Sequence, residues 1–147
     1  MGFSDIPVRT NGQDVEASWF NTIRTQLVSW FGTGVIAESQ DTIDNAGSAE
    51  SVVGLLFSGA AVRSAKIQYQ IYRKTDSYEY SEAGQFFVTY KTVDTSWEIG
   101  GESSTGDADT TFAITDAGQV TYTSSNMSGA SYTGKMRFKA ETLSVES

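Results

Sequence analysis

Short segments with strand-like patterns recur at intervals of roughly ten residues through most of the chain. Apolar and polar residues alternate in most of them, as expected of β-strands that bury one face. In the clearest segment, AKIQYQIYRK, Ile67, Tyr69 and Ile71 share one face. The pattern predicts seven or eight strands, in the segments 34–39, 51–59, 65–74, 84–92, 96–100, 110–115, 119–124 and 134–145.

The connections between these segments are rich in Gly, Ser, Asn and Asp. Asp116-Ala117-Gly118 is typical of a β-hairpin turn, and Gly54 is a candidate β-bulge inside an apolar run. A short helix at 51–59 is the alternative for that run. Many short strands separated by turn signals favour an antiparallel sandwich or barrel. Because the loops are uneven in length, we expect a mainly β, jelly-roll-like sandwich over residues 33–147.

One segment, Asp14 to Gly32, has the different period of an α-helix. Its apolar residues recur at spacings of three and four, which places them on one helical stripe. Asp14 can cap the first turn, and Gly32 suits the residue after the last turn. We therefore expect one amphipathic helix within an N-terminal unit of residues 1–32.

Burying the stripe would contribute about 10 kcal/mol or more, so we expect something to cover it. The helix could lie on its own β-domain, form a seam between subunits, or bind another protein. The flexible Gly32-Thr33-Gly34 joint argues against tight packing on the same chain, so we expect a homo-oligomer, most simply a trimer. The predicted interface residues are Trp19, Phe20, Ile23, Leu27, Trp30 and Phe31.

The first 13 residues are expected to be extended, because Pro7 disfavours helix at the residue before it. Phe3, Ile6 and Val8 are apolar side chains in an otherwise polar lead. Phe3, Ile6, Pro7 and Val8 could therefore anchor the protein to a neighbouring subunit or a larger assembly, although a free terminus is the alternative.

Composition excludes several classes of function. The net charge of −8 argues against nucleic acid and anionic membranes as partners. No apolar run is long enough to span a membrane, and the N-terminus lacks the pattern of a secretory signal. The chain contains neither His nor Cys, which removes Ser–His and Cys–His nucleophiles and the usual zinc sites. We expect no catalytic residues, no metal, no cofactor and no enzyme activity.

The charged residues suggest only weak alternatives to this expectation. Glu102, Asp107 and Asp109 fall in one Gly/Ser-rich segment, read as a solvated loop, with Ca²⁺ binding as the alternative. Either Glu79 with Glu82 or Asp107 with Asp109 could be proposed as paired acids for glycoside hydrolysis. Alternate residues Lys135, Arg137 and Lys139 form a basic stripe, expected at a protected edge or a solvent face, or paired with acidic loops of a neighbouring subunit.

Four tyrosines occupy polar positions in the predicted strands and loops. Aromatic side chains in such places can stack on sugar rings or anchor a protein partner, although they often only cover a sheet edge. The tyrosines that could face a ligand are Tyr72, Tyr78, Tyr80 and Tyr132.

Two parts of the sequence resemble structural proteins of tailed-bacteriophage virions. The opening DIPVRTNGQDVEASWFNTIRTQL is similar to their N-terminal segments. The second part, similar to β-sandwich domains of tail fibres, comprises KIQYQIYRKTD, GQFFVTYKT, SWEIGGESSTGDADTTFAITDAGQVTYTSSNMSG and GKMRFKAETL.

The resemblance implies a virion protein of short-fibre or fibre-tip type, attached to other virion proteins by its N-terminus. It also implies a trimeric β-domain exposed at the particle surface, with a host-surface glycan as a further partner. The chain has no extended shaft between the predicted helix and the β-domain, which keeps a minor capsid or head-decoration protein open. A carbohydrate-binding module is the alternative from a different class, and a small glycan-degrading enzyme ranks last.

Overall fold

The computed structural model describes residues 34–146, which form eight β-strands. The predicted N-terminal unit (residues 1–32) lies outside these residues, and so do its helix, its anchor residues and its interface residues. The described strands are β1 (Val35–Thr42), β2 (Glu50–Leu56), β3 (Val62–Lys74), β4 (Glu79–Lys91), β5 (Ser96–Asp107), β6 (Thr110–Ile114), β7 (Gln119–Ser124) and β8 (Thr133–Ser144).

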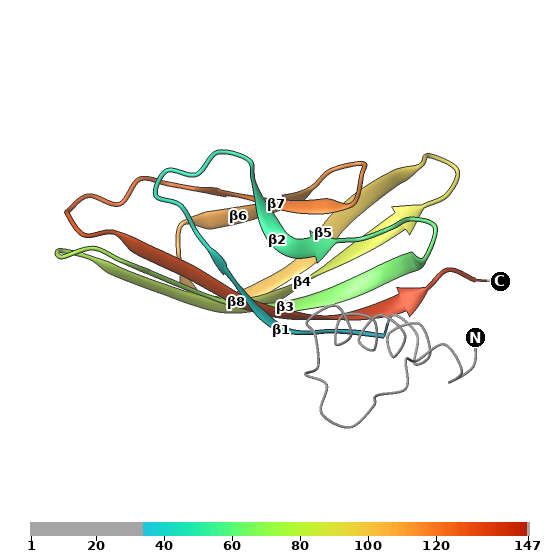
Figure 1. The fold of residues 1–147 in the computed structure, drawn as a ribbon, viewed down its shortest axis with the longest axis horizontal. Coiled ribbons are helices and arrows are strands. Elements are labelled where there is room, and N and C mark those ends of the chain that lie inside the picture. The colour runs from blue at the N-terminus through green and yellow to red at the C-terminus, as the bar shows by residue number, and fades with distance from the viewer. Residues whose placement is uncertain (1–33, 147) are drawn as a thin grey trace, which may run out of the picture. The chain divides into compact units, whose positions relative to one another are not determined.

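The strands form two antiparallel sheets. A five-stranded sheet has the order β1-β8-β3-β4-β5, and a three-stranded sheet has the order β2-β7-β6. Figure 1 shows the smaller sheet lying over one face of the larger sheet. The other face of the five-stranded sheet, called the outer face below, therefore carries the side chains that point away from the smaller sheet.

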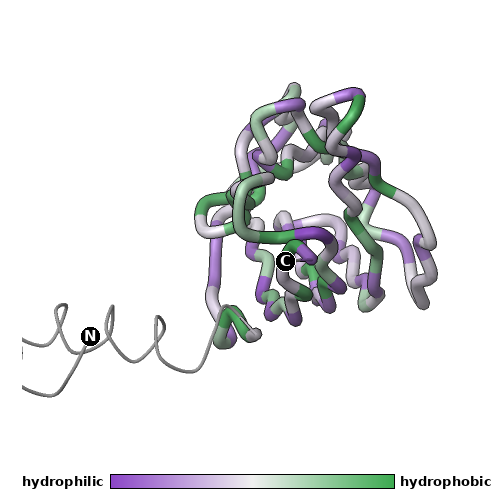
Figure 2. The backbone as a smooth tube through the Cα atoms, turned by 90° about the vertical axis from the view of Figure 1, so that its right-hand side faces the viewer, coloured by the Kyte–Doolittle hydropathy of each residue, from purple (hydrophilic) through white to green (hydrophobic). Residues whose placement is uncertain are grey.

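One apolar core joins the two sheets, and it follows the predicted alternation. Ile67, Tyr69 and Ile71 on β3 are buried, and so are Met136 and Phe138 on β8. Figure 2 shows hydrophobic and hydrophilic residues alternating along the backbone. The remaining apolar core residues are Ile43, Val52, Leu55, Phe57, Val62, Ala65, Phe86, Val88, Trp97, Ala108, Val120, Tyr122 and Ala140.

Strands β4 and β5 extend furthest beyond their predicted segments. Strand β4 begins at Glu79, before the predicted segment 84–92, and β5 continues to Asp107 through the predicted Gly/Ser loop. Residues 100–107 are all exposed, so this half of the edge strand β5 buries neither face. A strand that buries neither face has no apolar alternation, which is why the sequence pattern did not show it.

The two turn and bulge predictions are confirmed. Gly54 has a φ of 99° beside a register shift in β2, so the apolar run at 51–59 contains a bulged strand and not a helix. Gly118 has a φ of 86° in the β6–β7 connection, where its N–H donates to the Thr115 carbonyl.

The jelly-roll class remains a prediction. The nested pairing of β1 with β8 and of β2 with β7 suits a jelly roll, whereas β3, β4 and β5 follow one another in a single sheet. The structure supports a mainly β fold of two antiparallel sheets. Within the described part of the chain, no helix is long and apolar enough to cross a membrane.

Candidate functional site

The connections between strands collect at two opposite ends of the domain. Lys74 pairs with both Glu79 and Thr133, which brings the β3–β4 and β7–β8 connections together. Residues 43–49, 75–78, 108–109 and 125–132 make up this end, called the loop end. At the opposite end the Gly34 carbonyl accepts a bond from the Thr142 N–H. That end, called the terminus end, comprises Gly34, Val145 and residues 57–61, 92–95 and 115–118. In Figure 1 the loop end lies toward the left and the terminus end toward the right.

A buried arginine holds the loop end together. Arg73 has no exposed surface, and its guanidinium makes five hydrogen bonds, matching its five N–H donors. Nε donates to the Tyr132 hydroxyl at 3.0 Å, and Nη1 donates to the carbonyls of Ala108 and Asp109 at 2.7 and 3.3 Å. Nη2 donates to Asn45 Oδ1 at 3.4 Å and to the Ser125 carbonyl. One side chain on β3 therefore binds three of the four loops.

Further hydrogen bonds connect the loops to one another. The Met127 N–H donates to Asn45 Oδ1 at 2.7 Å, and Asn45 Nδ2 donates back to the Met127 carbonyl at 3.1 Å. In the same way, the Asp76 N–H donates to the Ala130 carbonyl at 3.0 Å, and the Ala130 N–H donates to Asp76 Oδ1 at 2.9 Å. Thr75 Oγ1 donates to the Ser128 carbonyl at 3.0 Å. These reciprocal bonds fix the relative positions of the loops.

The loop end also contains most of the unusual backbone conformations. Five non-glycine residues in the described part of the chain have a positive φ, and four of them, Ala46, Ala49, Asp109 and Ser131, lie in its loops. A non-glycine residue in a sparsely populated region costs on the order of 1–3 kcal/mol, so such residues persist only where the surroundings determine them. Strained residues held by buried polar contacts are typical of preorganised recognition surfaces.

A second buried charged residue lies beside this network. Glu82 is 8% exposed, and its carboxylate accepts from the Tyr69 hydroxyl at 2.6 Å and from the Ala108 N–H at 3.0 Å. Burial, followed by the hydrogen bond to Glu82, raises the pKa of Tyr69 far above its usual range. Glu79 is exposed and lies on the opposite face of β4 from Glu82, because odd-numbered and even-numbered residues of a strand face opposite ways, so the structure does not bring this pair together.

The four predicted ligand-facing tyrosines lie at or near the loop end but on different surfaces. Tyr78, at the β3–β4 connection, is 52% exposed, and Tyr72, on the outer face, is 37% exposed. Tyr80 is half-buried. Tyr132 is also half-buried; it accepts from Arg73 and donates to the Ile43 carbonyl at 2.8 Å. The loop end therefore presents Tyr78 as its exposed aromatic side chain and uses Tyr132 internally.

The predicted acidic loop is mainly strand. Glu102 and Asp107 lie on β5, and only Asp109 is in a connection, where its side chain accepts a hydrogen bond from Ser125. In residues 34–146, no group of three or more acidic residues could hold a metal ion, so the Ca²⁺ alternative gains no support there.

The basic stripe is on the solvent face of β8. Lys135, Arg137 and Lys139 are exposed and alternate with the buried residues Met136 and Phe138. Because β8 lies between β1 and β3, the edge-strand interpretation of the stripe is wrong, and the solvent-face interpretation agrees with the structure.

Neither Arg73 nor Asn45 was predicted from the sequence to be a functional residue. A signal for Arg73 was present, because it continues the inward face of Ile67, Tyr69 and Ile71. An arginine at an inward position of a regular strand predicts a buried charge that needs several acceptors. Asn45 carried no comparable signal, since its partner Met127 is far along the chain and belongs to another loop.

The loops expose mainly small polar side chains around Tyr78. Exposed serines, aspartates and Asn126 surround the buried contacts of Arg73. Tyr, Ser, Gly and Asn are the residues that antibody loops use for recognition, because they combine low conformational cost with adaptable hydrogen bonding. The described loop end can therefore bind a polar partner through Tyr78 and neighbouring hydrogen-bonding groups.

No protein-family model matches the chain, and no curated protein matches it. Among solved structures, the fold is similar to part of the tailspike protein of Acinetobacter phage vB_ApiP_P1, with a TM-score of 0.43 and 15% sequence identity. The match covers 73% of this chain and 21% of the tailspike, so the chain spans about one fifth of that protein's length.

Proposed function

We propose that this protein is a non-enzymatic structural protein of a tailed-phage virion, of short-fibre or fibre-tip type. Its N-terminal segment attaches it to other virion proteins, and its loop end faces outward and binds the host surface. The observation that carries the outward role is the Arg73 network, which holds a set of strained polar loops opposite the end where the chain enters the domain. The virion role comes from the sequence resemblance given above.

The distribution of exposed apolar side chains supports this orientation. Val35, Phe87, Val93 and Leu143 are 70%, 43%, 97% and 69% exposed, and all lie toward the terminus end, whereas Val53 and Leu56 on β2 are 70% and 63% exposed. Within the loops of the loop end, the large exposed apolar residue is Tyr78, which carries a hydroxyl group. Apolar surface suits a protein neighbour, whereas a tyrosine among small polar residues suits reversible recognition.

The proposal assigns no chemical reaction to the loop end. Glu82 is buried and accepts hydrogen bonds from the Tyr69 hydroxyl and the Ala108 N–H, whereas Glu79 is exposed on the other face of β4. Trp and Tyr side chains on an exposed concave face would have favoured a carbohydrate-binding module. Trp97, the tryptophan that the structure describes, is 6% exposed and packs against Phe57 and Tyr90.

Gold-labelled antibodies against the purified protein test the virion role directly. On intact particles of the phage that encodes this chain, we expect label at the tail. Label spread over the capsid would instead assign the protein to head decoration. Particles that carry no label, together with a positive signal for the free protein in the lysate, would overturn the virion assignment.

A further inference from the structure

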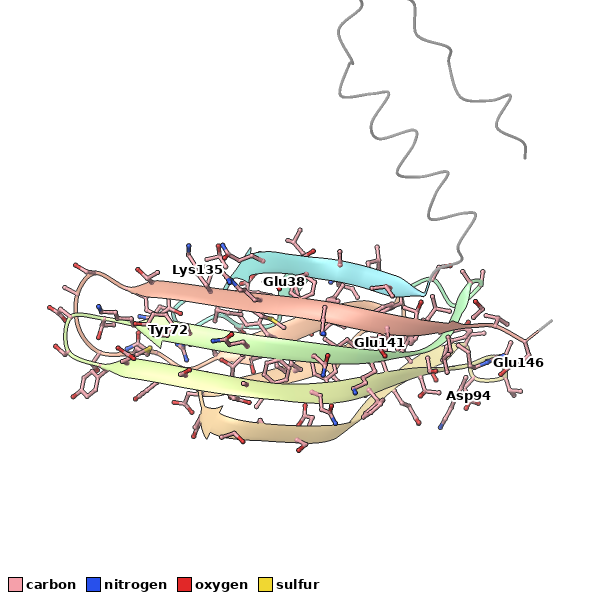
Figure 3. All side chains as sticks on the ribbon, turned by 90° about the horizontal axis from the view of Figure 1, so that it is seen from below. Glu38, Tyr72, Asp94, Lys135, Glu141 and Glu146 are labelled. Atoms are coloured by element: carbon pink, nitrogen blue, oxygen red, sulfur yellow. The ribbon has the colours of Figure 1, made fainter. Side chains whose placement is uncertain are left out.

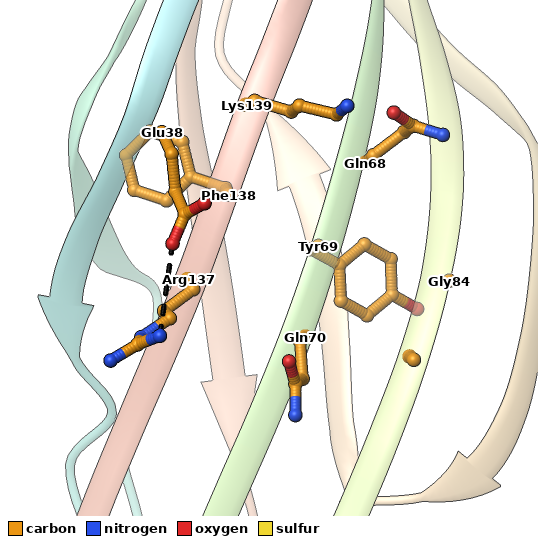
Figure 4. A pocket seen from close by; sticks show the side chains of 9 residues that line it. Glu38, Gln68, Tyr69, Gln70, Gly84, Arg137, Phe138 and Lys139 are labelled. Atoms are coloured by element: carbon orange, nitrogen blue, oxygen red, sulfur yellow. Dashed lines mark ion pairs between the residues drawn. The ribbon is translucent and has the colours of Figure 1, made fainter.

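A shallow groove crosses the outer face of the five-stranded sheet, away from the loop end. Its volume is about 620 Å³, and Figure 4 shows its side chains. Gln68 and Gln70 come from β3, Arg137 and Lys139 come from β8, and Glu38 comes from β1. The groove is separate from the Arg73 network, because Arg73 points to the opposite side of β3.

The register explains why the sheet is hollowed there. Gln70 pairs with Arg137 on one side and with Ala83 on the other, and Ala83 pairs with Thr105. Paired residues share one face of a sheet, so the methyl group of Ala83 lies beside the long side chain of Gln70. Because the side chain of Ala83 is small, it leaves a hollow beside Gln70, which is exposed to solvent.

Cationic side chains are concentrated on this face. The chain has a net charge of −8 and only ten Lys and Arg residues, but six of them occupy outer-face positions by strand alternation and register. Figure 3 views this face with all described side chains drawn, including Lys135. The six are Lys66, Lys74, Lys91, Lys135, Arg137 and Lys139.

The same face also carries five carboxylates by register, so the excess of positive charge is local to β8; the five are Glu38, Glu79, Glu98, Asp107 and Glu141. Lys91 pairs with Glu98, and Arg137 lies 3.7 Å from Glu38 in an exposed pair. Lys135 and Lys139 form no ion pair with any residue in the described part of the chain. Alternate residues of a strand are about 6.6 Å apart, so Lys135, Arg137 and Lys139 present a regular row of cations along β8.

We propose that this groove binds an anionic polysaccharide, with its acidic groups along the β8 cations and its hydroxyl groups on the β3 amides. Each Gln amide can both donate and accept, as a sugar hydroxyl requires, and Gln68 and Gln70 make no hydrogen bond through their side chains to any described residue. The cations supply the charge complementarity that selects an acidic polymer over a neutral one.

The lining favours a polysaccharide over a nucleic acid. Single-stranded nucleic acids are held by aromatic side chains on which the bases stack. The two aromatic residues at the groove, Tyr69 and Phe138, are buried and point into the core, where Tyr69 bonds Glu82. The groove therefore offers charge and amides and no exposed ring.

The test measures binding of the full-length protein to alginate, a linear carboxylated polysaccharide, in low salt. Dextran serves as the uncharged polymer and single-stranded DNA as the other anionic polymer. The variant is Lys139→Gln combined with Arg137→Gln, and the matched control is Lys91→Gln combined with Lys74→Gln, which removes the same charge from the same face outside the groove. We expect alginate to bind, dextran to bind at least tenfold more weakly, and added salt to weaken alginate binding.

We expect the groove variant to lose at least tenfold in alginate affinity while the control loses less than threefold. Equal losses in the two variants, no alginate binding, or tighter binding to DNA would each overturn the proposal. A lower native mass of the groove variant would also overturn it, by assigning the cations to a subunit contact. A Tyr78→Ala variant should keep its alginate affinity, which separates this site from the loop end.

Discussion

Arg73 and Glu82 are both buried, and they bind opposite sides of one residue, Ala108. Arg73 Nη1 donates to the Ala108 carbonyl at 2.7 Å, and the Ala108 N–H donates to Glu82 Oε2 at 3.0 Å. The two charges form no direct ion pair within 4.0 Å. The connection from β5 to β6 is therefore fixed by charge-assisted hydrogen bonds on both sides, which are stronger than neutral ones.

Arg73→Met should destabilise the protein severely. The substitution keeps a long apolar side chain but removes all five hydrogen bonds of the buried guanidinium. A hydrogen bond to a charged group contributes about 1.5–3 kcal/mol, so we expect the free energy of unfolding to fall by about 3 kcal/mol or more. Urea denaturation followed by tryptophan fluorescence measures the change.

Arg137→Met provides the matched control for that measurement. Arg137 carries the same group on the outer face, where its side chain is 64% exposed. Exposed substitutions away from special features usually change stability by about 0.5 kcal/mol or less. Similar losses from the two variants would contradict a specific role for Arg73.

Stability should decrease at alkaline pH partly through Tyr69. Burial and the bond to Glu82 raise its pKa in the folded state above the ordinary value of 10.0. Below pH 10 the Tyr69 phenol is protonated in both the folded and the unfolded state, and its contribution to the free energy of unfolding is fully present. As pH rises above 10, the unfolded chain releases this proton first, so the free energy of unfolding falls. Urea denaturation between pH 8 and 11 should show this decrease, with a shallower slope for Tyr69→Phe.

The control for the pH series is Tyr78→Phe, because Tyr78 is exposed at the β3–β4 connection. Its slope should match that of the unsubstituted protein. If Tyr69→Phe also leaves the slope unchanged, the alkaline loss of stability has another origin.

The existence of the strands was predictable from the sequence, but the full length of β5 and the contacts of the loop end were not. Strand β8 was predictable because Met136 and Phe138 alternate with Lys135 and Arg137, a local pattern set by burial of one face. The second half of β5 was missed because an edge strand of Gly, Ser and Thr has no such alternation.

The candidate site depends on contacts that are distant in the sequence. Arg73 bonds the Ser125 carbonyl across 52 positions, and Asn45 bonds the Met127 N–H across 82. Every residue has a main-chain carbonyl group, so the sequence cannot show which carbonyl groups accept hydrogen bonds from a buried side chain such as Arg73. Of the predicted tyrosines, Tyr78 and Tyr72 are exposed as expected, whereas Tyr132 is part of the internal network.

The proposed trimer depends on the predicted helix stripe, which lies outside the described residues. Ile23→Asp or Leu27→Asp should lower the native mass to that of a monomer, because a charge at a buried subunit contact is costly. Native mass spectrometry measures the mass, and circular dichroism checks that the β-domain stays folded. Thr25→Asp, off the stripe, should leave the mass unchanged.

A different result would reassign the stripe. If Ile23→Asp stays oligomeric and the β-domain unfolds, the stripe belongs to the core of its own chain. A native mass that matches one chain for the unsubstituted protein would contradict the trimer itself.

Adsorption of the fluorescently labelled full-length protein to intact host bacteria tests the central claim, that the loop end binds the host surface. Tyr78→Ala removes an exposed ring whose side chain makes no hydrogen bond to any described residue, and Phe87→Ala removes a similarly exposed ring toward the terminus end. We predict that the unsubstituted protein binds, that Tyr78→Ala weakens binding about tenfold, as expected for an aromatic anchor, and that Phe87→Ala binds normally. Equal binding by all three proteins, or weaker binding by Phe87→Ala alone, would contradict the account.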